Sequence, residues 1–341
     1  MKYRKLPSGL QVSEIGFGMW TVSTGWWGNY SDGEAVRLLR EAFNLGITLF
    51  DAADTYGNGR SENLIRQAFG TEREQIVIAT KVGYNFLEHG NDRRGQRAIP
   101  QDFRAEAIRQ ATDAALCRLG TETIDILQLH NIHMEQVRDD ELWETLEDLR
   151  SQGKIRLYGV SLGPAIGWLA EGVLAIQRRN PAVIQHIYNI LEQYPGSTIH
   201  QAAQDGNAQT RFFIRVPHSS GMLEGHYTEE TVFQPGDHRS HRPRSWLVNG
   251  IKKVEQLRFL ELENRTLAQA ALLWLLAEDR VASTLPNIYN TDQLREFATA
   301  PDSPSLTIEE LKCIQNLSTT NFGLEPEPVI FKGTMETIPV A

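Results

Sequence analysis

The chain has 341 residues, and its 34 Lys and Arg residues against 43 Asp and Glu residues give a formal net charge of −9 at pH 7. Hydrophobic residues make up 41% and charged residues 23% of the sequence, which is ordinary for a globular protein and argues against a disordered or collagen-like chain. The acidic balance provides no electrostatic attraction for nucleic acid or an anionic membrane, and we expect neither as a partner.

The two cysteines, Cys117 and Cys313, are too few for a disulfide framework or a four-cysteine metal site. The charged N-terminus is not followed by the apolar stretch of a signal peptide. The longest apolar stretch, residues 267–277, is far shorter than the roughly 20 residues that span a bilayer. We therefore expect a cytoplasmic protein.

Short runs of β-forming residues alternate with helical patterns along the chain. Several runs are almost continuously apolar, as expected of parallel strands covered on both faces, and their starts recur at intervals of about 30 residues, the length of one βα unit. This pattern predicts an α/β fold, namely a (β/α)8 TIM barrel. We expect a single domain of residues 1–341, with the barrel core at about 10–300 and a C-terminal helix and tail at about 301–341. The predicted strands are residues 15–20, 47–53, 76–82, 124–130, 155–161, 183–189, 212–217 and 281–285.

The first helical pattern, residues 35–43, carries its apolar residues on one face. Ser31 and Glu34 have the spacing of a capping box before it, and Gly46 stands where such a helix ends. The segment therefore predicts an amphipathic helix that covers the strands.

Two further apolar stripes, at residues 108–119 and 142–149, predict helices, and Pro164 suits the first turn of another. Two connections are longer than the rest, residues 83–99 after the third strand and 221–244 after the seventh. In a barrel the loops that follow the strands build the active site, so we expect these insertions to serve binding.

Four polar residues stand at or just beyond the C-terminal ends of three consecutive predicted strands. Asp51 ends the second strand and Tyr56 follows in its loop, while Lys81 and His130 end the third and fourth strands. Each residue taken singly has an ordinary explanation, as a turn aspartate, a packed tyrosine, a solvated lysine or a structural histidine. Because the C-terminal ends of barrel strands converge on one pocket, we expect the four side chains to meet there.

These residue types suit the reduction of a carbonyl group. Tyrosine has a reference pKa of about 10 and is a poor acid at neutral pH, but a neighbouring ammonium lowers the pKa of a phenol. Lys81 would supply that ammonium, Asp51 would hold it charged and oriented, and His130 can hydrogen-bond a carbonyl oxygen. The set can therefore protonate a carbonyl oxygen while a hydride reaches the carbon.

The sequence resembles the aldo-keto reductases from about residue 3 to about residue 317. The resemblance rests on Gly46-Ile47-Thr48-Leu49-Phe50-Asp51 through Gly57, on the strand-end Lys81, on Asp125-Ile126-Leu127-Gln128-Leu129-His130 and on Gly159-Val160-Ser161. It implies a (β/α)8 barrel and an NAD(P)H-dependent carbonyl reductase. By position it implies Tyr56 as the general acid, Lys81 and Asp51 as the pair that tunes it, and His130 as the residue that orients the carbonyl.

The resemblance also assigns a cofactor site. Ser161 and Gln185 match positions that hold the nicotinamide carboxamide, and Arg215 falls where a side chain stacks on the nicotinamide. Residues 219–223 match the stretch that lines the pyrophosphate, and residues 293–296 match the adenine side. The residues implied to bind the cofactor are Met19, Trp20, Ser161, Gln185, Arg215, Pro217, Ser219, Ser220, Leu223, Asn287, Gln293 and Glu296.

The chain departs from the family pattern where the cofactor's phosphates bind. Leu162 replaces a usual asparagine, His226 a frequent lysine, and Phe297 the last asparagine of the phosphate loop. No Lys or Arg occupies the usual 2′-phosphate positions, and a strong phosphate clamp needs guanidinium or ammonium donors. The resemblance implies NADP(H), whereas these residues leave NAD(H) as the alternative. Residues 236–244 of the second insertion either supply charge to this site or form a solvated loop end.

Two other motifs carry less weight. Residues 57–62 begin like a dinucleotide fingerprint, but Glu62 replaces its third glycine, so we expect no Rossmann site. His130 and His133 have metal-like spacing, but no acidic third ligand is evident and we expect no bound metal.

We therefore predict an oxidoreductase that reduces aldehydes or ketones, or oxidises sugar-like alcohols, by hydride transfer with Tyr56 as general acid. Its substrate would be a small carbonyl or polyol compound, and Trp20, Trp26, Trp27 and Tyr84 are candidates for an apolar wall or for ordinary loop packing. The alternative is a slow or non-catalytic regulatory or partner subunit that binds the cofactor on the same barrel. A third class, a phosphate-binding barrel isomerase or lyase, predicts phosphate-ester substrates and no change in NADPH.

Overall fold

The computed structural model describes residues 1–89, 99–326 and 328–336. Eight strands form one sheet of parallel pairs, in which each strand lies beside the next one along the chain. They are β3 (Phe17–Gly18), β4 (Leu49–Asp51), β5 (Val77–Val82), β6 (Ile124–His130), β7 (Ile155–Ser161), β8 (Val183–Ile187), β9 (Arg211–Arg215) and β10 (Val281–Leu285).

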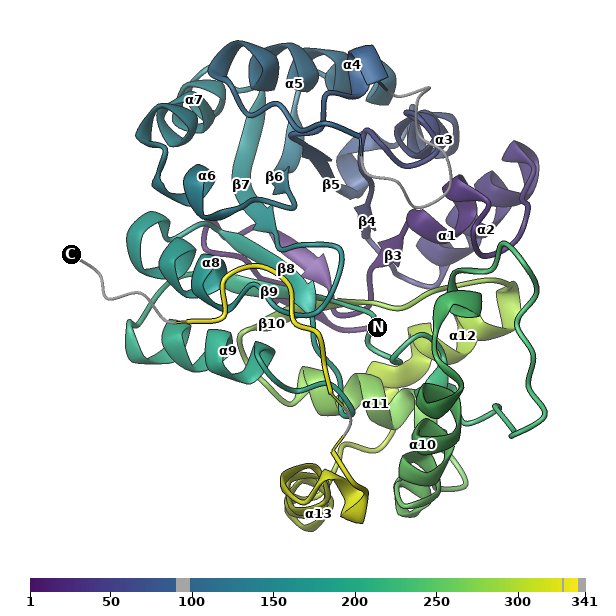
Figure 1. Cartoon of the computed structure of the whole chain (residues 1–341). Coiled ribbons are helices and arrows are strands. Elements are labelled where there is room, and N and C mark those ends of the chain that lie inside the picture. The colour runs from purple at the N-terminus through teal and green to yellow at the C-terminus, as the bar shows by residue number, and fades with distance from the viewer. Residues whose placement is uncertain (90–98, 327, 337–341) are drawn as a thin grey trace.

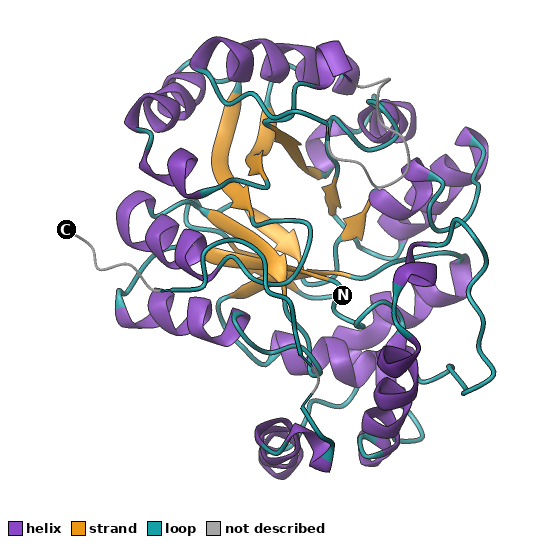
Figure 2. Ribbon diagram, viewed as in Figure 1, coloured by secondary structure: helices purple, strands orange, loops and turns teal. Residues whose placement is uncertain are grey.

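The sheet closes on itself beside β3. Ile15 and Thr284 form a parallel bridge, in which the Gly16 N–H donates to the carbonyl oxygen of Thr284 at 2.8 Å. A Cβ atom at Gly16 would lie 2.7 Å from Cδ2 of Leu285, so a larger residue there would force the Leu285 side chain to move. The predicted (β/α)8 barrel is thereby confirmed, with strands inside and helices outside (Figures 1 and 2).

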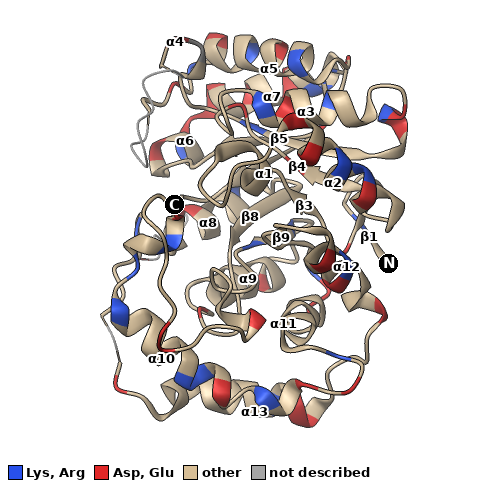
Figure 3. Ribbon diagram, turned by 90° about the vertical axis from the view of Figure 1, so that its right-hand side faces the viewer, with Lys and Arg blue, Asp and Glu red and all other residues tan. Residues whose placement is uncertain are grey.

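The helices cover the outside of the barrel, and Figure 3 shows the charged residues mostly on helices and loops. Within the described residues no helix is long and apolar enough to cross a membrane. The α-helices are α1 (Trp20–Thr24), α2 (Asp32–Asn44), α3 (Arg60–Phe69), α4 (Phe86–His89), α5 (Ala105–Leu119), α6 (Met134–Arg138), α7 (Asp140–Ser151), α8 (Leu169–Leu174), α9 (Gly196–Asp205), α10 (Arg244–Glu255), α11 (Leu267–Leu276), α12 (Thr291–Thr299) and α13 (Ile308–Thr319).

The capping box before α2 is confirmed, because the Glu34 N–H donates to the Ser31 hydroxyl and the Ser31 N–H donates to the Glu34 carboxylate. The helix predicted from Pro164 is wrong, because α8 begins only at Leu169. Residues 164–166 form bends instead, and the C-terminal tail packs against the chain that follows, since the Trp168 N–H donates to the carbonyl oxygen of Lys332 at 2.7 Å. Sequence spacing carries no signal of this distant contact.

The predicted strands 15–20 and 47–53 are longer than the observed β3 and β4. Trp20 already begins α1, so the first strand ends at Gly18, which pairs with Asp51 at the end of β4. The insertion 83–99 contains α4, and its residues 90–98 lie outside the described residues. The insertion 221–244 contains two 3₁₀ turns, η4 (Met222–Glu224) and η5 (His238–His241).

An antiparallel hairpin that the strand prediction did not include, β1 (Tyr3–Lys5) with β2 (Gln11–Ser13), closes one end of the barrel. Leu6 and Val12 join the apolar cluster inside the barrel, whose members include Leu49, Val77 and Val183, the first residues of their strands. The apolar residues thus fill the N-terminal end, and the polar strand-end residues lie at the other end, as the barrel architecture predicts.

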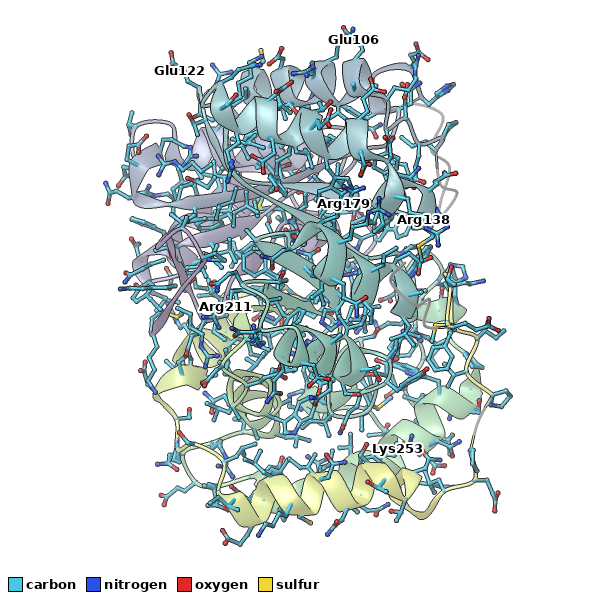
Figure 4. All side chains as sticks on the ribbon, turned by 90° about the vertical axis from the view of Figure 1, so that its left-hand side faces the viewer. Glu106, Glu122, Arg138, Arg179, Arg211 and Lys253 are labelled. Carbon is cyan, nitrogen blue, oxygen red and sulfur yellow. The ribbon has the colours of Figure 1, made fainter. Side chains whose placement is uncertain are left out.

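Two further apolar layers hold the helices. One lies between the strands and the surrounding helices, and the other lies beneath α10, α11 and α13. Figure 4 shows Lys253 of α10 next to α13, and its ammonium donates to Asn321 just after that helix at 2.9 Å. The C-terminal helix is therefore packed against the outside of the barrel, away from the strand ends.

Candidate active site

Lys81 and Asp51 form a buried ion pair at the C-terminal ends of β5 and β4. The Nζ atom of Lys81 lies 2.7 Å from Oδ2 of Asp51 and donates to the carbonyl oxygen of Ala52, also at 2.7 Å. Burial alone would lower the pKa of Lys81, but the charge and hydrogen bonding of Asp51 and Tyr56 raise that pKa above its usual value. The lysine therefore stays charged although it is completely buried.

Two buried amides hold the other oxygen of Asp51. The Nε2 atom of Gln128 in β6 donates to Oδ1 at 3.1 Å, and that of Gln185 in β8 donates at 2.9 Å. We did not select Gln128 from the sequence. It stands two residues before His130, so the alternation of strand side chains places both on one face, and that spacing was the available signal.

Tyr56 lies in the loop between β4 and α3, with its ring beside the lysine. The Nζ atom of Lys81 is 4.8 Å from the ring centroid, and the Trp20 ring meets the phenol edge-on at 4.9 Å. The base of this loop is held by Ser61 of α3, whose hydroxyl donates to the carbonyl oxygen of Ala53 at 2.8 Å. The phenol is therefore held between an ammonium and an aromatic side chain.

His130 completes the group at the end of β6. Its ring lies edge-on to Tyr56, with 5.9 Å between centroids, and to Tyr84, with 5.1 Å. Asn131 donates to the Tyr84 hydroxyl at 2.8 Å, and Gln101 donates to the carbonyl oxygen of His130 at 3.1 Å. The structure thus brings together the four residues that the sequence predicted as catalytic.

The predicted aromatic wall divides into two parts. Trp20 and Tyr84 flank the phenol and the imidazole, and Trp26 packs edge-on against Trp20 at 5.1 Å. Trp26 and Trp27 both stack on His238 of the second insertion, at 6.1 and 5.6 Å. Trp20 and Tyr84 therefore border the phenol and the imidazole, and Trp26 and Trp27 hold the insertion.

The residues expected at the nicotinamide end come from three neighbouring strands. Ser161 ends β7 and its hydroxyl donates to the Gln185 side chain of β8 at 3.3 Å. Arg215 ends β9 and donates to the carbonyl oxygen of Leu162 at 2.6 Å and to that of Gly163. Burial lowers the pKa of Arg215, and the nearby Tyr56 and Asp51 oppose that effect. Polar side chains thus border the cluster on the side where a nicotinamide ring would bind.

The segment after β9 suits an anionic group. Ser219, Ser220 and Gly221 have positive φ angles of 47°, 58° and 92°. Among the described residues, no hydrogen bond uses the backbone N–H groups of Ser220 and Gly221, and Arg242 donates to the Ser220 hydroxyl at 3.4 Å. Free N–H groups beside a guanidinium fit a pyrophosphate, and Arg242 is a positive charge that residues 236–244 bring to this site.

Arg239, by contrast, is held within the insertion. Its guanidinium makes two hydrogen bonds to Asp237, at 2.9 and 2.6 Å, and one to the Tyr227 hydroxyl at 2.7 Å. It also lies 4.8 Å from the ring centroids of both Trp27 and Phe233. This arginine fastens the insertion to the loop after β3.

Where the sequence predicts the adenine side, Glu224 and Gln293 form a partly buried pair. The Nε2 atom of Gln293 donates to Oε2 of Glu224 at 2.9 Å, and the Tyr289 N–H donates to the Gln293 oxygen at 3.0 Å. Burial is the main cause that raises the pKa of Glu224 to about 7, against the effect of Gln293. The sequence did not predict Glu224 as a site residue, because an acidic residue next to a predicted phosphate-binding segment does not indicate a role in binding.

The remaining cofactor candidates differ in how they are presented. The side chains of Met19 and Leu223 lie in apolar clusters, so only their backbones are available to a ligand. Pro217 is buried and follows Val216, which has a positive φ angle of 56°. Asn287 and Glu296 accept hydrogen bonds from threonine hydroxyls, at 3.5 and 2.6 Å. In the described residues no group of three or more His, Cys, Asp or Glu side chains is arranged to hold a metal ion.

The chain was compared with known proteins. The model of the aldo/keto reductase family matches residues 14–319. An uncharacterised oxidoreductase of Bacillus subtilis is 29% identical over 93% of this chain and 96% of its own length, and a protein of Escherichia coli named NADH-specific methylglyoxal reductase is 29% identical over 87% and 93%. The holo structure of an aldo-keto reductase from Bacillus halodurans is 29% identical, with a TM-score of 0.74 over 93% of this chain and 96% of that one.

Proposed function

Because the chain belongs to the aldo/keto reductase family of NAD(P)-dependent oxidoreductases, we propose that Tyr56 donates the proton with which it reduces a small aldehyde or ketone. The observation that carries this proposal is the buried ammonium of Lys81, held by Asp51 and 4.8 Å from the centre of the phenol ring. The cytoplasmic location expected from the sequence stays a prediction.

A bound nicotinamide nucleotide supplies a hydride to the carbonyl carbon. The residues of this chain handle the proton and the developing charge on the oxygen. His130 orients the carbonyl oxygen by a hydrogen bond, and Tyr56 transfers its hydroxyl proton to that oxygen, which becomes the alcohol. The negative charge left on the phenol lies beside Lys81, whose buried ammonium stabilises it.

The same groups support the reverse reaction. With the phenol deprotonated, Tyr56 accepts the proton of an alcohol, and the oxidised nicotinamide nucleotide would take up the hydride from the carbon, so a polyol would be a substrate in the oxidative direction. The aromatic side chains of Trp20 and Tyr84 favour a substrate with an apolar flank next to its carbonyl group. The relative named as a methylglyoxal reductase supports small aldehydes as the first compounds to test.

The residues at the cofactor side fit a dinucleotide. Unpaired N–H groups at Ser220 and Gly221 and the guanidinium of Arg242 suit its pyrophosphate, and Ser161 and Gln185 suit the carboxamide of the nicotinamide. NADPH is the cofactor that the family resemblance implies, and NADH is the alternative that the missing cations favour.

The test is the Tyr56→Phe variant. We expect kcat/KM for methylglyoxal and other activated aldehydes, followed by the absorbance of NADH or NADPH, to fall by at least about 100-fold, because general-acid catalysis contributes that much. Tyr158→Phe is the matched control, since that phenol pairs with Glu147 on the outer side of β7. Unchanged turnover in Tyr56→Phe contradicts the mechanism, and cofactor binding without turnover in the wild type, with a stable partner complex, favours a regulatory subunit.

A further inference from the structure

Three buried polar atoms without a hydrogen-bond partner among the described residues lie beneath the second insertion. They are Oε1 of Glu224, Nδ1 of His218 and the hydroxyl oxygen of Tyr289. Oε1 of Glu224 lies 3.9 Å from Nδ1 of His218, which is too far for a hydrogen bond between them. Native proteins leave few buried polar atoms unpaired, so such a group indicates a site that a ligand or water completes.

These atoms belong to one connected arrangement. Gln293 donates to the second oxygen of Glu224, at 2.9 Å, and accepts from the Tyr289 backbone at 3.0 Å. The other nitrogen of His218, Nε2, lies 3.1 Å from the carbonyl oxygen of Ala268, so the ring is fixed with Nδ1 on the side of the carboxylate. The cluster is therefore rigid, and its open positions are one carboxylate oxygen, one imidazole nitrogen and one phenol oxygen.

The cluster stands between the two ends of the proposed cofactor site. Glu224 lies three residues after Gly221, whose N–H and that of Ser220 are, in the described part of the chain, free for a pyrophosphate, and Gln293 belongs to α12 on the proposed adenine side. The part of a dinucleotide that joins pyrophosphate to adenine is the adenosine ribose. Under the proposed function, this ribose is the group that meets Glu224.

A carboxylate distinguishes the two nicotinamide nucleotides at this ribose. The 2′-hydroxyl and 3′-hydroxyl groups of NADH donate hydrogen bonds that a carboxylate accepts, which is the chemistry that acidic residues perform in other dinucleotide sites. The 2′-phosphate of NADPH carries negative charge and no comparable donor, so it is repelled unless arginine or lysine replaces the carboxylate.

Arg242 lies at the pyrophosphate segment, where it donates to the Ser220 hydroxyl, and two other arginines on this side are held by carboxylates. Arg239 is held by two hydrogen bonds to Asp237, and Arg295 of α12 is exposed and pairs with Glu41 of α2. Each would have to leave its carboxylate to reach a 2′-phosphate. The charge beside the ribose position is therefore the carboxylate of Glu224, which is ionised above its raised pKa of about 7, so the binding experiment is run at pH 8.

We propose that Glu224 selects NADH over NADPH by accepting hydrogen bonds from the adenosine ribose hydroxyls and repelling a 2′-phosphate. The inference rests on the proposed function, because it requires a nicotinamide nucleotide across this end of the barrel. His218 and Tyr289 add neutral hydrogen-bonding positions beside the same ribose, and Gln293 holds the carboxylate in place.

The experiment measures binding rather than turnover. NADH and NADPH are titrated separately into the wild type, Glu224→Gln and Glu147→Gln, and the Kd of each is read from tryptophan fluorescence quenching. We expect the wild type and Glu147→Gln to bind NADH at least about 10-fold more tightly than NADPH, a difference of about 1.4 kcal/mol. Glu224→Gln should lower that ratio by about 10-fold, since the amide keeps the shape and removes the charge.

A second measurement needs no variant. 5′-AMP and 2′,5′-ADP, which differ only by the 2′-phosphate, compete with bound NADH on the wild type, and we expect 5′-AMP to displace it at the lower concentration. The inference is overturned if the wild type binds NADPH as tightly as NADH or more tightly, or if 2′,5′-ADP displaces NADH better. It is also overturned if the ratio of the two Kd values is unchanged in a folded Glu224→Gln. Each of these results leaves the reductase proposal standing. Failure of both NADH and NADPH to bind overturns both.

Discussion

The ammonium of Lys81 lies 2.7 Å from the carboxylate of Asp51, and this pair is buried at the C-terminal end of the barrel. Burial alone lowers the pKa of the lysine, and Asp51 is the first of the groups that raise it. The carboxylate is therefore the reason that a fully buried amine keeps its proton beside the phenol of Tyr56.

In Asp51→Asn we expect burial to dominate, so that the pKa of Lys81 falls. The enzyme then loses the charged lysine at a lower pH, and the alkaline limb of the pH profile of kcat/KM moves to lower pH by at least about one pH unit. The measurement is kcat/KM from pH 5.5 to pH 10 in wild type and variant.

Asp140→Asn is the matched control for this profile. Asp140 is an exposed residue that pairs with Arg179, so the same chemical change there should leave the alkaline limb where it is. An alkaline limb that stays in place in Asp51→Asn would mean that Lys81 does not set it.

The catalytic part of the site follows from local sequence patterns. Because the C-terminal ends of parallel barrel strands lie together, the positions of Asp51, Lys81 and His130 at strand ends were enough to predict that their side chains lie close to one another. Gln128 required one more step, the alternation of side chains along β6. Patterns within single strands therefore predict the proposed catalytic residues, but they do not predict residues such as Gln128 that act through Asp51.

The rest of the site depends on contacts between distant segments. Gln293 of α12 donates to one oxygen of the Glu224 carboxylate and leaves the other without a partner among the described residues. Arg239 is held in the insertion by aromatic rings from three different loops. The irregular chain after Pro164 is likewise set by the C-terminal tail. None of these contacts produces a periodic pattern in the sequence. The sequence therefore predicted only that these loops serve binding, and not which of their residues meet.

The N-terminal hairpin provides a test of stability. Leu6 is 3% exposed and packs inside the barrel with the first residues of several strands. We expect Leu6→Ala to lower the free energy of unfolding by about 2–5 kcal/mol, because it removes buried methyl groups and leaves a cavity. Urea unfolding followed by circular dichroism measures the change.

Val232→Ala provides the comparison, since Val232 is 77% exposed in the second insertion and should change stability by no more than about 0.5 kcal/mol. The KM and kcat of folded Leu6→Ala should match the wild type, because the hairpin lies at the end opposite to Tyr56. An equal loss in both variants would mean that the hairpin does not close a packed interior.

Burial lowers the pKa of His218 to about 4, and this predicts a loss of stability in acid. Between pH 6.5 and pH 4 the unfolded chain binds a proton at this histidine that the folded chain does not bind, so the free energy of unfolding falls as pH falls. Between pH 7 and pH 5 this one group should remove about 2 kcal/mol.

His218→Gln tests the contribution directly, because its amide can still donate to the carbonyl oxygen of Ala268 and does not titrate. Glu224 acts in the opposite direction, since its raised pKa makes the folded chain bind an extra proton between about pH 4.5 and pH 7. The informative quantity is therefore the difference between variant and wild type in urea unfolding at pH 7 and pH 5. We expect the variant to lose less stability than the wild type over this interval, and an equal loss would show that His218 is protonated in the folded protein.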